Sequence, residues 1–456
     1  MSGIEVIPSA KRLIRSLRDM GYDFSQAIAD VVDNSIEAEA ALVAIDVEFD
    51  GDDSWVRIAD NGVGMKPEQL REAMRYGAER QYADDDLGKF GLGLKTASMS
   101  QCQCLSVASR WNPDRADIAA YSWDLDHIEK TNRWEILPLV REDLGKSIRE
   151  PLKDTVGTVV LWQRIDRILG YKHPYGEASR KRLSQTCREI ESHLGMVFHR
   201  FLSGETGGKR LKLLLNGNEI KPWDPFCRAE GKTKPLQTVS IPIEYEGVAG
   251  NVLLEPFVLP HQDDFSSSEA FGNATGPANW NQQQGFYIYR AGRMIQSGGW
   301  SNLRTVDEHT KLARIAISFA PALDEAFKIN VAKMRVQMPS SIRDAIREAV
   351  VPVVKLAREI YDRKPALSSA QALARPANTA SADHPEVIRH VGNDSSVPAS
   401  TVYSVKTSGS HRVHENEPTR EPANYLTLNQ WSEMMLNVAN AQERPIVQSV
   451  LNKLQK

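Results

Sequence analysis

Helix-like and strand-like segments alternate along the first part of this 456-residue chain. Apolar residues recur at helical spacing in two segments, and β-branched or aromatic residues dominate three others. The expected helices cover 11–20 and 24–38, and the expected strands cover 42–49, 55–59 and 157–162. The first part of the chain is therefore expected to contain both helices and strands.

Composition divides the chain into four parts. Residues 1–165 are expected to form a first domain, and 166–365, which include a long expected helix at 341–361, a second. Residues 366–422 are rich in Ala, Ser, Pro, Thr and Asn and poor in large apolar residues, which predicts a flexible linker. Apolar periodicity returns in 423–456 and predicts a C-terminal helical segment.

The charge and hydropathy of the chain exclude several classes of protein. The 56 basic and 59 acidic residues give a formal net charge of -3, which excludes a strongly basic nucleic-acid coat and a wholly acidic disordered chain. No apolar run approaches the roughly 20 residues that a membrane-spanning helix needs. The N-terminus has no apolar signal core. We therefore expect a cytoplasmic protein that does not associate with a membrane.

The cysteines and one acidic loop are weak candidates for metal binding. Four cysteines in so long a chain argue against a disulfide scaffold. Cys102 and Cys104 form a C-x-C pair, whereas Cys187 and Cys227 stand alone, so the C-x-x-C pairs typical of zinc sites are missing. We interpret these residues as buried or inert thiols. The loop at 261–264, HQDD, is interpreted as solvated polar residues, so no second catalytic activity is expected.

The first chemical motif lies on the expected helix at 24–38. Asp30 and Asn34 are four residues apart, so they share one helix face. A carboxylate and a carboxamide on one face can hold a water molecule and a magnesium ion, which takes a few protein oxygens together with phosphates and water. A solvated polar helix face explains the same pattern when this helix is taken alone.

The second and fourth motifs flank strands. Asp60 follows the expected strand at 55–59, and Gly62 and Gly64 after it let the backbone approach a flat ligand closely. The aspartate can then accept a hydrogen bond from an exocyclic amine such as that of adenine. A simple strand-exit turn is the alternative interpretation. Thr158, at the start of the strand 157–162, has by itself only a structural interpretation.

The third motif places three glycines before an expected helix start: Gly88, Gly91 and Gly93. Backbone N–H groups in such a position can hold anionic phosphates, and Lys89 and Lys95 add positive charge. The stretch nearly matches the Walker A pattern. Leu94 separates Gly93 from Lys95, so the P-loop interpretation fails.

The order of the four motifs is more specific than any one of them. An acidic helix with an asparagine, then D-x-G-x-G, then G-x-x-G-x-G-x-K, then G-T follow one another within 165 residues. This order resembles the GHKL ATPases, the superfamily that joins DNA gyrase, the large heat-shock chaperone, sensor histidine kinases and MutL. The resemblance implies an α+β fold that begins with an ATP-binding α/β sandwich, the Bergerat fold. ATP and Mg2+ would bind between its helices and its sheet.

The resemblance also implies a role for each motif. Asp60 would bind the adenine amine with support from Thr158, Asn34 would coordinate magnesium, and Asp30 would be the general base. The nucleotide-contacting residues implied in this way are Asn34, Asp60, Gly62, Gly64, Met65, Gly88, Lys89, Gly91, Leu92, Gly93, Lys95, Thr96 and Thr158.

Asp30 departs from the commoner pattern of the superfamily, which has glutamate at this position. A general base must reach the attacking water directly or through one more water, and aspartate is one methylene shorter than glutamate. We therefore expect a magnesium-dependent ATPase whose turnover is slow.

The second domain resembles the ribosomal-protein-like transducer domain of gyrase, MutL and MORC proteins. In the segment 327–336, Lys333 matches the transducer lysine, which implies a catalytic contact with the γ-phosphate. The segments 216–226 and 285–295 resemble prokaryotic MORC-like proteins. The sequence shows no phosphorelay histidine segment and no nucleic-acid cleavage core, so a prokaryotic MORC-like ATP-binding protein fits best.

Two functional interpretations stay open. The first is an ATP-gated clamp that forms a homodimer on ATP binding and acts on DNA or a partner protein. Basic residues are frequent in 167–212, although a solvated helix explains them equally well. The alternative is a regulatory ATP-binding subunit with little turnover that controls a partner nuclease or helicase. Either fits a restriction or antiphage defence system. A chaperone is the weakest interpretation, because a large client-binding middle region is missing.

Overall fold

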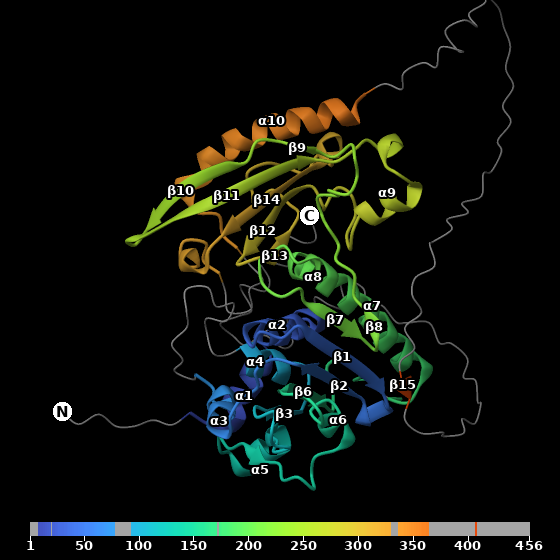
Figure 1. Cartoon of the computed structure of the whole chain (residues 1–456), viewed down its shortest axis with the longest axis vertical. Helices are drawn as coiled ribbons and strands as arrows, with labels where there is room; N and C mark the ends of the chain where they lie inside the picture. The colour runs from blue at the N-terminus through green and yellow to red at the C-terminus, as the bar shows by residue number, and fades with distance from the viewer. Residues whose placement is uncertain are drawn as a thin grey trace, which may run out of the picture. The chain divides into compact units, whose positions relative to one another are not determined.

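The computed structural model describes residues 8–19, 21–77, 93–170, 173–329, 336–363 and 406–407 (Figure 1). Contacts divide the chain into two units, 1–408 and 409–456, and the second unit lies outside the described residues. The expected C-terminal helical segment and all of the expected linker except 406–407 therefore also lie outside them. Within the first unit the predicted α+β class is confirmed, because helices pack against two separate sheets.

In the described part of the chain, the first sheet has the strand order β5-β4-β3-β6-β2-β1-β7-β8, with β15 also pairing with β1. Its strands are β1 (Leu42–Phe49), β2 (Trp55–Asp60), β3 (Cys104–Arg110), β4 (Ala119–Asp124), β5 (Leu137–Pro138), β6 (Gly157–Gln163), β7 (Lys212–Leu215), β8 (Asn218–Glu219) and β15 (Lys406–Thr407). β7 and β15 run parallel to β1, and the other neighbours are antiparallel.

β7 and β8 extend the first sheet beyond the predicted boundary at residue 165. Leu42–Ile45 of β1 pair in register with Lys212–Leu215 of β7. The boundary itself stays a prediction, but the strands of the first sheet come from both sides of it.

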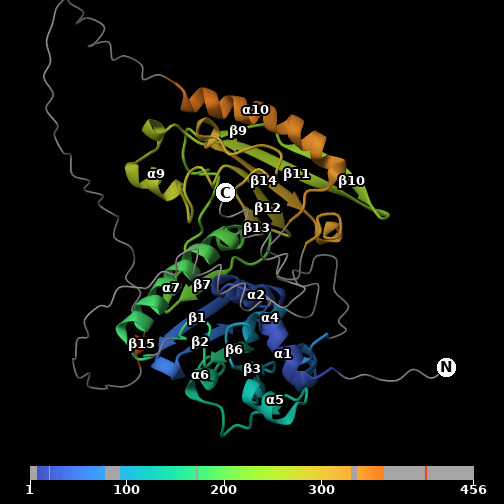
Figure 2. The same cartoon turned by 180° about the vertical axis from the view of Figure 1, so that it is seen from behind.

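Helices cover the first sheet (Figure 2). They are α1 (Ala10–Arg18), α2 (Phe24–Glu37), α3 (Pro67–Met74), α4 (Gly93–Met99), α5 (Leu125–Thr131), α6 (Lys146–Arg149), α7 (Glu177–Val197) and α8 (His199–Ser203). α2 begins after Asp23, whose side chain accepts a hydrogen bond of 3.0 Å from the backbone N–H of Gln26 and so caps the helix.

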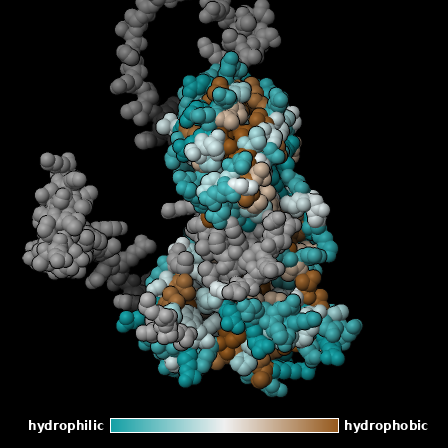
Figure 3. All heavy atoms as spheres, turned by 90° about the vertical axis from the view of Figure 1, so that its left-hand side faces the viewer, coloured by the Kyte–Doolittle hydropathy of each residue, from teal (hydrophilic) through white to brown (hydrophobic). Residues whose placement is uncertain are grey.

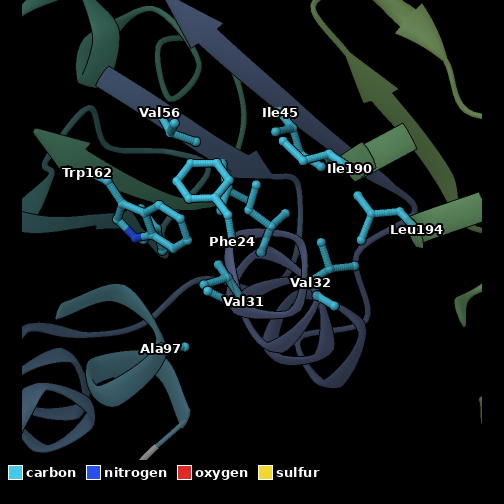
Figure 4. Close-up of a cluster of buried hydrophobic side chains, with 14 of the residues drawn as sticks. Phe24, Val31, Val32, Ile45, Val56, Ala97, Trp162, Ile190 and Leu194 are labelled. Carbon is cyan, nitrogen blue, oxygen red and sulfur yellow. The ribbon is translucent and has the colours of Figure 1, made fainter. Parts of the chain in front are cut away.

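The alternation of side chains along the strands builds two apolar layers, one on each face of the sheet. Ile58 and Trp162 belong to the large cluster that includes α2 and α7, whereas Ala59 and Leu161 face a smaller cluster that includes Ile148 of α6. Figure 4 shows the larger cluster, in which side chains of α2, the strands and α7 meet. In it the rings of Phe24 and Trp162 pack edge to face, with their centroids 5.6 Å apart.

The second sheet has the strand order β10-β11-β14-β12-β13, with β9 also pairing with β11. Its strands are β9 (Lys234–Pro235), β10 (Val239–Tyr245), β11 (Val248–Val258), β12 (Gly285–Arg290), β13 (Arg293–Ser297) and β14 (Ala313–Phe319). Its helices are α9 (Ser268–Ala274) and α10 (Arg343–Tyr361). α10 buries Ile346, Val350 and Val353 in the core of this sheet.

A tight turn between β12 and β13 determines which side chain begins β13. Ala291 and Gly292 both have positive φ, 46° and 82°, as a two-residue hairpin turn of the primed type requires. The turn reverses the chain so that Arg293 begins β13 opposite Arg290. Tyr289 and Met294, on this hairpin, are buried in the same cluster as the apolar face of α7. The first unit therefore has a core that continues from one sheet to the other.

The surface seen in Figure 3 carries mainly hydrophilic residues, with separate apolar patches. Among the described helices, none combines the length and the apolar composition that crossing a membrane requires. All four cysteines are free, and burial raises the pKa of Cys187 to about 12 and that of Cys227 to about 11. In the described ranges, no group of three His, Cys, Asp or Glu side chains is arranged to hold a metal ion.

Candidate nucleotide-binding site

The carboxylate of Asp60, at the end of β2, is held by three hydrogen-bond donors from three parts of the chain. Its Oδ1 accepts from the backbone N–H of Gly62 at 2.9 Å and from that of Thr158 at 3.1 Å. Its Oδ2 accepts from Ser35 Oγ on α2 at 3.1 Å. Burial raises the pKa of Asp60, and these three hydrogen bonds oppose that shift. The structure thus brings the predicted residues Asp60, Gly62 and Thr158 together beside α2.

Ser109 of β3 links two of the predicted motifs, although sequence reasoning did not select it. Its buried hydroxyl donates to the carbonyl of Gly157 at 2.9 Å and accepts from the backbone N–H of Met65 at 2.8 Å. The same oxygen lies 3.1 Å from Thr158 Oγ1. A single serine inside a strand forms no pattern along the chain, so only the pairing of β3 with β6 reveals it.

The glycines of the D-x-G-x-G motif lie against backbone of the protein itself. Gly64 has a φ of 70°, and a Cβ added there would lie 2.2 Å from the carbonyl oxygen of Arg110. A Cβ on Gly62 would lie 2.6 Å from the carbonyl oxygen of Ala38. Glycine is therefore needed at these two positions first of all because the turn packs closely onto the end of α2 and the end of β3.

Replacing Gly64 by alanine should destabilise the fold by about 1–3 kcal/mol more than replacing Gly77, because only Gly64 has backbone in the way. Gly77 is the matched control, since its φ is also 70° but a Cβ there would meet nothing within 4 Å. Urea unfolding of both variants gives the difference directly. Equal losses of stability would show that positive φ alone, rather than the close contact, demands glycine at position 64.

Asp30 and Asn34 lie next to one another on α2 but differ in exposure. Asp30 is buried, and its Oδ2 accepts a hydrogen bond of 3.0 Å from the hydroxyl of Tyr22. Asn34 is exposed, and its Nδ2 donates to the backbone carbonyl of Asp30 at 2.9 Å. Because the amide nitrogen is engaged with the helix, the amide oxygen of Asn34 is the atom that can face a cation. This arrangement fits the oxygen ligand that magnesium prefers.

α4 starts beside Asp30, and its side chains point into the protein. A Cβ on Gly93 would lie 3.9 Å from Asp30 Oδ2. Lys95 is buried, its Nζ donates to the carbonyl of Ala73 on α3 at 3.0 Å, and burial lowers its pKa to about 8. The hydroxyl of Thr96 is buried and has no hydrogen-bond partner among the described residues. Of the third motif, Gly88, Lys89, Gly91 and Leu92 lie outside the described residues, as does Lys333 of the second domain.

An arginine from the second sheet reaches the two carboxylates of α2. Arg293 Nη2 lies 3.3 Å from Asp30 Oδ1, and Arg293 Nε lies 2.8 Å from Asp33 Oδ1. All three side chains are at most 5% exposed. Neither Arg293 nor Asp33 was predicted as a site residue, because nothing along the sequence links positions 260 residues apart.

The sequence of this chain is similar to a known family and to several known proteins. Residues 22–158 match the family described as histidine kinase-, DNA gyrase B-, and HSP90-like ATPase. The DNA mismatch repair protein MutL of Haemophilus influenzae is 26% identical over 277 residues, which cover 60% of this chain and 38% of that protein. The chaperone protein HtpG of Shouchella clausii is 27% identical over 154 residues, which cover 30% of this chain and 24% of that protein.

A second MutL, from Kosmotoga olearia, is 28% identical over 96 residues, which cover 20% of this chain and 15% of that protein. The chain thus spans less than two fifths of each of these relatives. The match of the family model spans Asp30, Asn34, Asp60 and Thr158, so it covers the residues on which the resemblance depends. Residues 22–158 of this chain therefore form an ATPase domain of the GHKL superfamily, as the order of the four motifs predicted.

Proposed function

We propose that the site between α2 and the first sheet binds ATP with magnesium and hydrolyses it. The carboxylate of Asp60 carries this proposal. An ionised carboxylate offers about four lone-pair positions, and the three donors on Asp60 leave capacity on Oδ2, which accepts only from Ser35 among the contacts described above. An ordered, partly exposed acceptor of this kind fits the exocyclic amine of adenine.

The other predicted residues receive their proposed roles around Asp60. Gly62, Gly64, Met65 and Thr158 would frame the base. Asn34 would ligate a magnesium ion, which supplies positive charge to the phosphates when it is bound. The proposed phosphate-side residues are Gly88, Lys89, Gly91, Leu92, Gly93, Lys95, Thr96 and Lys333. The orphaned hydroxyl of Thr96 supports such a contact, whereas Lys95 would have to leave the carbonyl of Ala73 to make one.

Asp30 is the proposed general base for the attacking water. A base contributes when it lies within hydrogen-bond reach of that water, directly or through a second water. Asp30 lies one helical turn before Asn34 and beside the start of α4, which supports a position facing the phosphates. Its hydrogen bonds with Tyr22 and Arg293 hold the carboxylate in a fixed orientation.

At the level of the whole protein, we propose an ATP-gated homodimeric clamp that acts on DNA or on a partner protein in the cytoplasm. The similarity to a DNA mismatch repair protein supports DNA, and the contact of Arg293 with α2 supports coupling between the site and the second sheet. The proposal keeps a transducer-like second domain at 166–365, a likeness to prokaryotic MORC-like proteins, and a role in restriction or antiphage defence.

A regulatory subunit with little turnover is the second candidate function. Two observations favour it: aspartate stands at position 30 where the superfamily commonly has glutamate, and that aspartate is engaged by a buried arginine. Such a protein would hold ATP and signal to a partner nuclease or helicase.

The test is to measure nucleotide binding and single-turnover hydrolysis separately, each with magnesium and with excess EDTA. We expect ATP to bind. We expect slow hydrolysis with magnesium and no hydrolysis with EDTA. Binding without any hydrolysis would favour the regulatory subunit. A protein that binds neither ATP nor ADP would overturn the proposal. DNA binding that weakens steeply as salt rises would support the clamp on DNA, and no binding to any DNA at low salt would exclude it.

A further inference from the structure

A buried ionic cluster that contains Arg293, Asp30 and Asp33 joins the second sheet to the proposed catalytic helix. Arg293, the first residue of β13, uses Nη2 toward Asp30 and Nε toward Asp33, at 3.3 and 2.8 Å. Its guanidinium carbon also lies 5.8 Å from the centre of the Phe198 ring. The side chain of Asp30 is 4% exposed, that of Asp33 2% and that of Arg293 5%. Water therefore does little to screen this cluster.

Stability alone is a weak explanation for such a cluster. Burying charges costs desolvation free energy, and apolar residues of similar volume often stabilise a core as well or better. What a guanidinium provides is geometry, because its planar fork fixes the carboxylates that it contacts. Asp30 is held through both oxygens, since Oδ1 faces Arg293 and Oδ2 accepts from Tyr22.

The neighbouring arginine of the same hairpin behaves differently. Arg290, at the end of β12, is just as buried and pairs with Asp324 through Nε at 2.7 Å and Nη2 at 2.8 Å. Both partners of that pair belong to the second sheet and its connections. The hairpin thus directs one arginine to Asp324 and the other to the carboxylates of α2.

We infer that Arg293 is a positioning residue for ATP hydrolysis, through which the second sheet sets the orientation of Asp30. This inference rests on the proposed function, in which Asp30 is the base. Arg293 acts through Asp30 and needs no contact with the nucleotide. Any displacement of β13 relative to α2 moves the guanidinium and so changes where the Asp30 carboxylate points. Hydrolysis would therefore depend on the position of the second sheet, whereas adenine binding at Asp60 would not.

The test compares Arg293→Met and Arg293→Lys with the matched control Arg290→Met. We expect Arg293→Met to lower kcat by about 100-fold, the size of effect that a misplacement of about 1 Å in a catalytic group can cause. The Kd for ATP should change by less than about 3-fold, because Asp60 and its donors are untouched. Arg293→Lys keeps one positive charge and should restore part of kcat. Arg290→Met removes an equally buried ion pair and should leave kcat within about 3-fold of the wild type.

A second measurement does not depend on turnover. Hydrogen exchange of the α2 amides in the nucleotide-free protein should accelerate around Asp30 in Arg293→Met and stay unchanged in Arg290→Met. If Arg293→Met unfolds, the double variant Arg293→Met, Asp33→Asn is measured in its place. It removes one positive and one negative charge and so keeps the net charge of the cluster. Its kcat should be as low as that expected for the single variant.

Two outcomes separate this inference from the proposed function. Wild-type kcat in Arg293→Met or in the double variant, with ATP hydrolysed normally by the wild type, would overturn the inference and leave the proposed function intact. A loss of ATP binding equal to the loss of kcat would also overturn it, because Arg293 would then support the site as a whole. Failure of the wild type to bind ATP would instead overturn the proposed function.

Discussion

Asp60→Asn should weaken nucleotide binding by roughly 100-fold. A hydrogen bond to a charged acceptor contributes about 1.5–3 kcal/mol, and each 1.4 kcal/mol corresponds to a tenfold change in affinity. Asparagine also brings its own N–H donors, so the amide that satisfies Gly62 and Thr158 through its oxygen would turn its nitrogen toward the incoming amine of adenine. The loss should be seen by calorimetry or with a fluorescent ATP analogue.

The control for this variant is Asp46→Asn. Asp46 is a carboxylate on the neighbouring strand β1 that pairs with Arg57 and has no proposed role in the site. The Asp46→Asn variant should bind ATP with the affinity of the wild type. Thermal unfolding of both variants separates loss of binding from loss of the fold. Wild-type affinity in a folded Asp60→Asn protein would rule out adenine recognition by this residue.

Asp30→Asn should lower the rate of ATP hydrolysis by about 10²–10⁴-fold, which is the range that a general base contributes. The amide oxygen can still accept from Arg293, and the amide N–H can donate to the hydroxyl oxygen of Tyr22, so the site should keep its shape. The affinity for ATP should change little, because Asp60 and Asn34 keep their side chains. Single-turnover hydrolysis and equilibrium binding, measured on the same preparation, provide the two numbers.

Asp46→Asn again serves as the control and should hydrolyse ATP at the wild-type rate. An Asp30→Asn protein that turns over normally would show that another group activates the water. A protein that loses binding along with turnover would show that Asp30 holds the nucleotide site together rather than acting on the water.

Local sequence patterns predicted the part of the site in which neighbouring residues carry the information. Asp60 and its two glycines form a turn, and a turn depends on residues close in sequence. The capped start of α2 at Asp23 is predictable for the same reason. Thr158 could be predicted only from the order of several motifs, because a threonine at the start of a strand has no distinctive local pattern.

The contacts that complete the site depend on tertiary structure instead. Ser109 reaches the site only because β3 pairs with β6. Arg293 reaches Asp30 only because the turn at Ala291 and Gly292 orients β13 and because the two sheets share one core. Lys95 was predicted to lie near the phosphates because of its charge, yet the structure buries it against α3. In a helix this short, periodicity does not reveal which face turns inward.

Because β7 pairs with β1 in the first sheet, the N-terminal domain cannot be shortened freely. A fragment that ends near residue 165 would keep Asp30, Asp60 and Thr158 but lose the strand that pairs with Leu42–Ile45. The N–H and C=O groups of that stretch would then line an open sheet edge, above apolar side chains that the intact protein buries. Such edges recruit strands from other molecules and promote aggregation. An isolated ATPase fragment should therefore extend at least through Glu219, the end of β8.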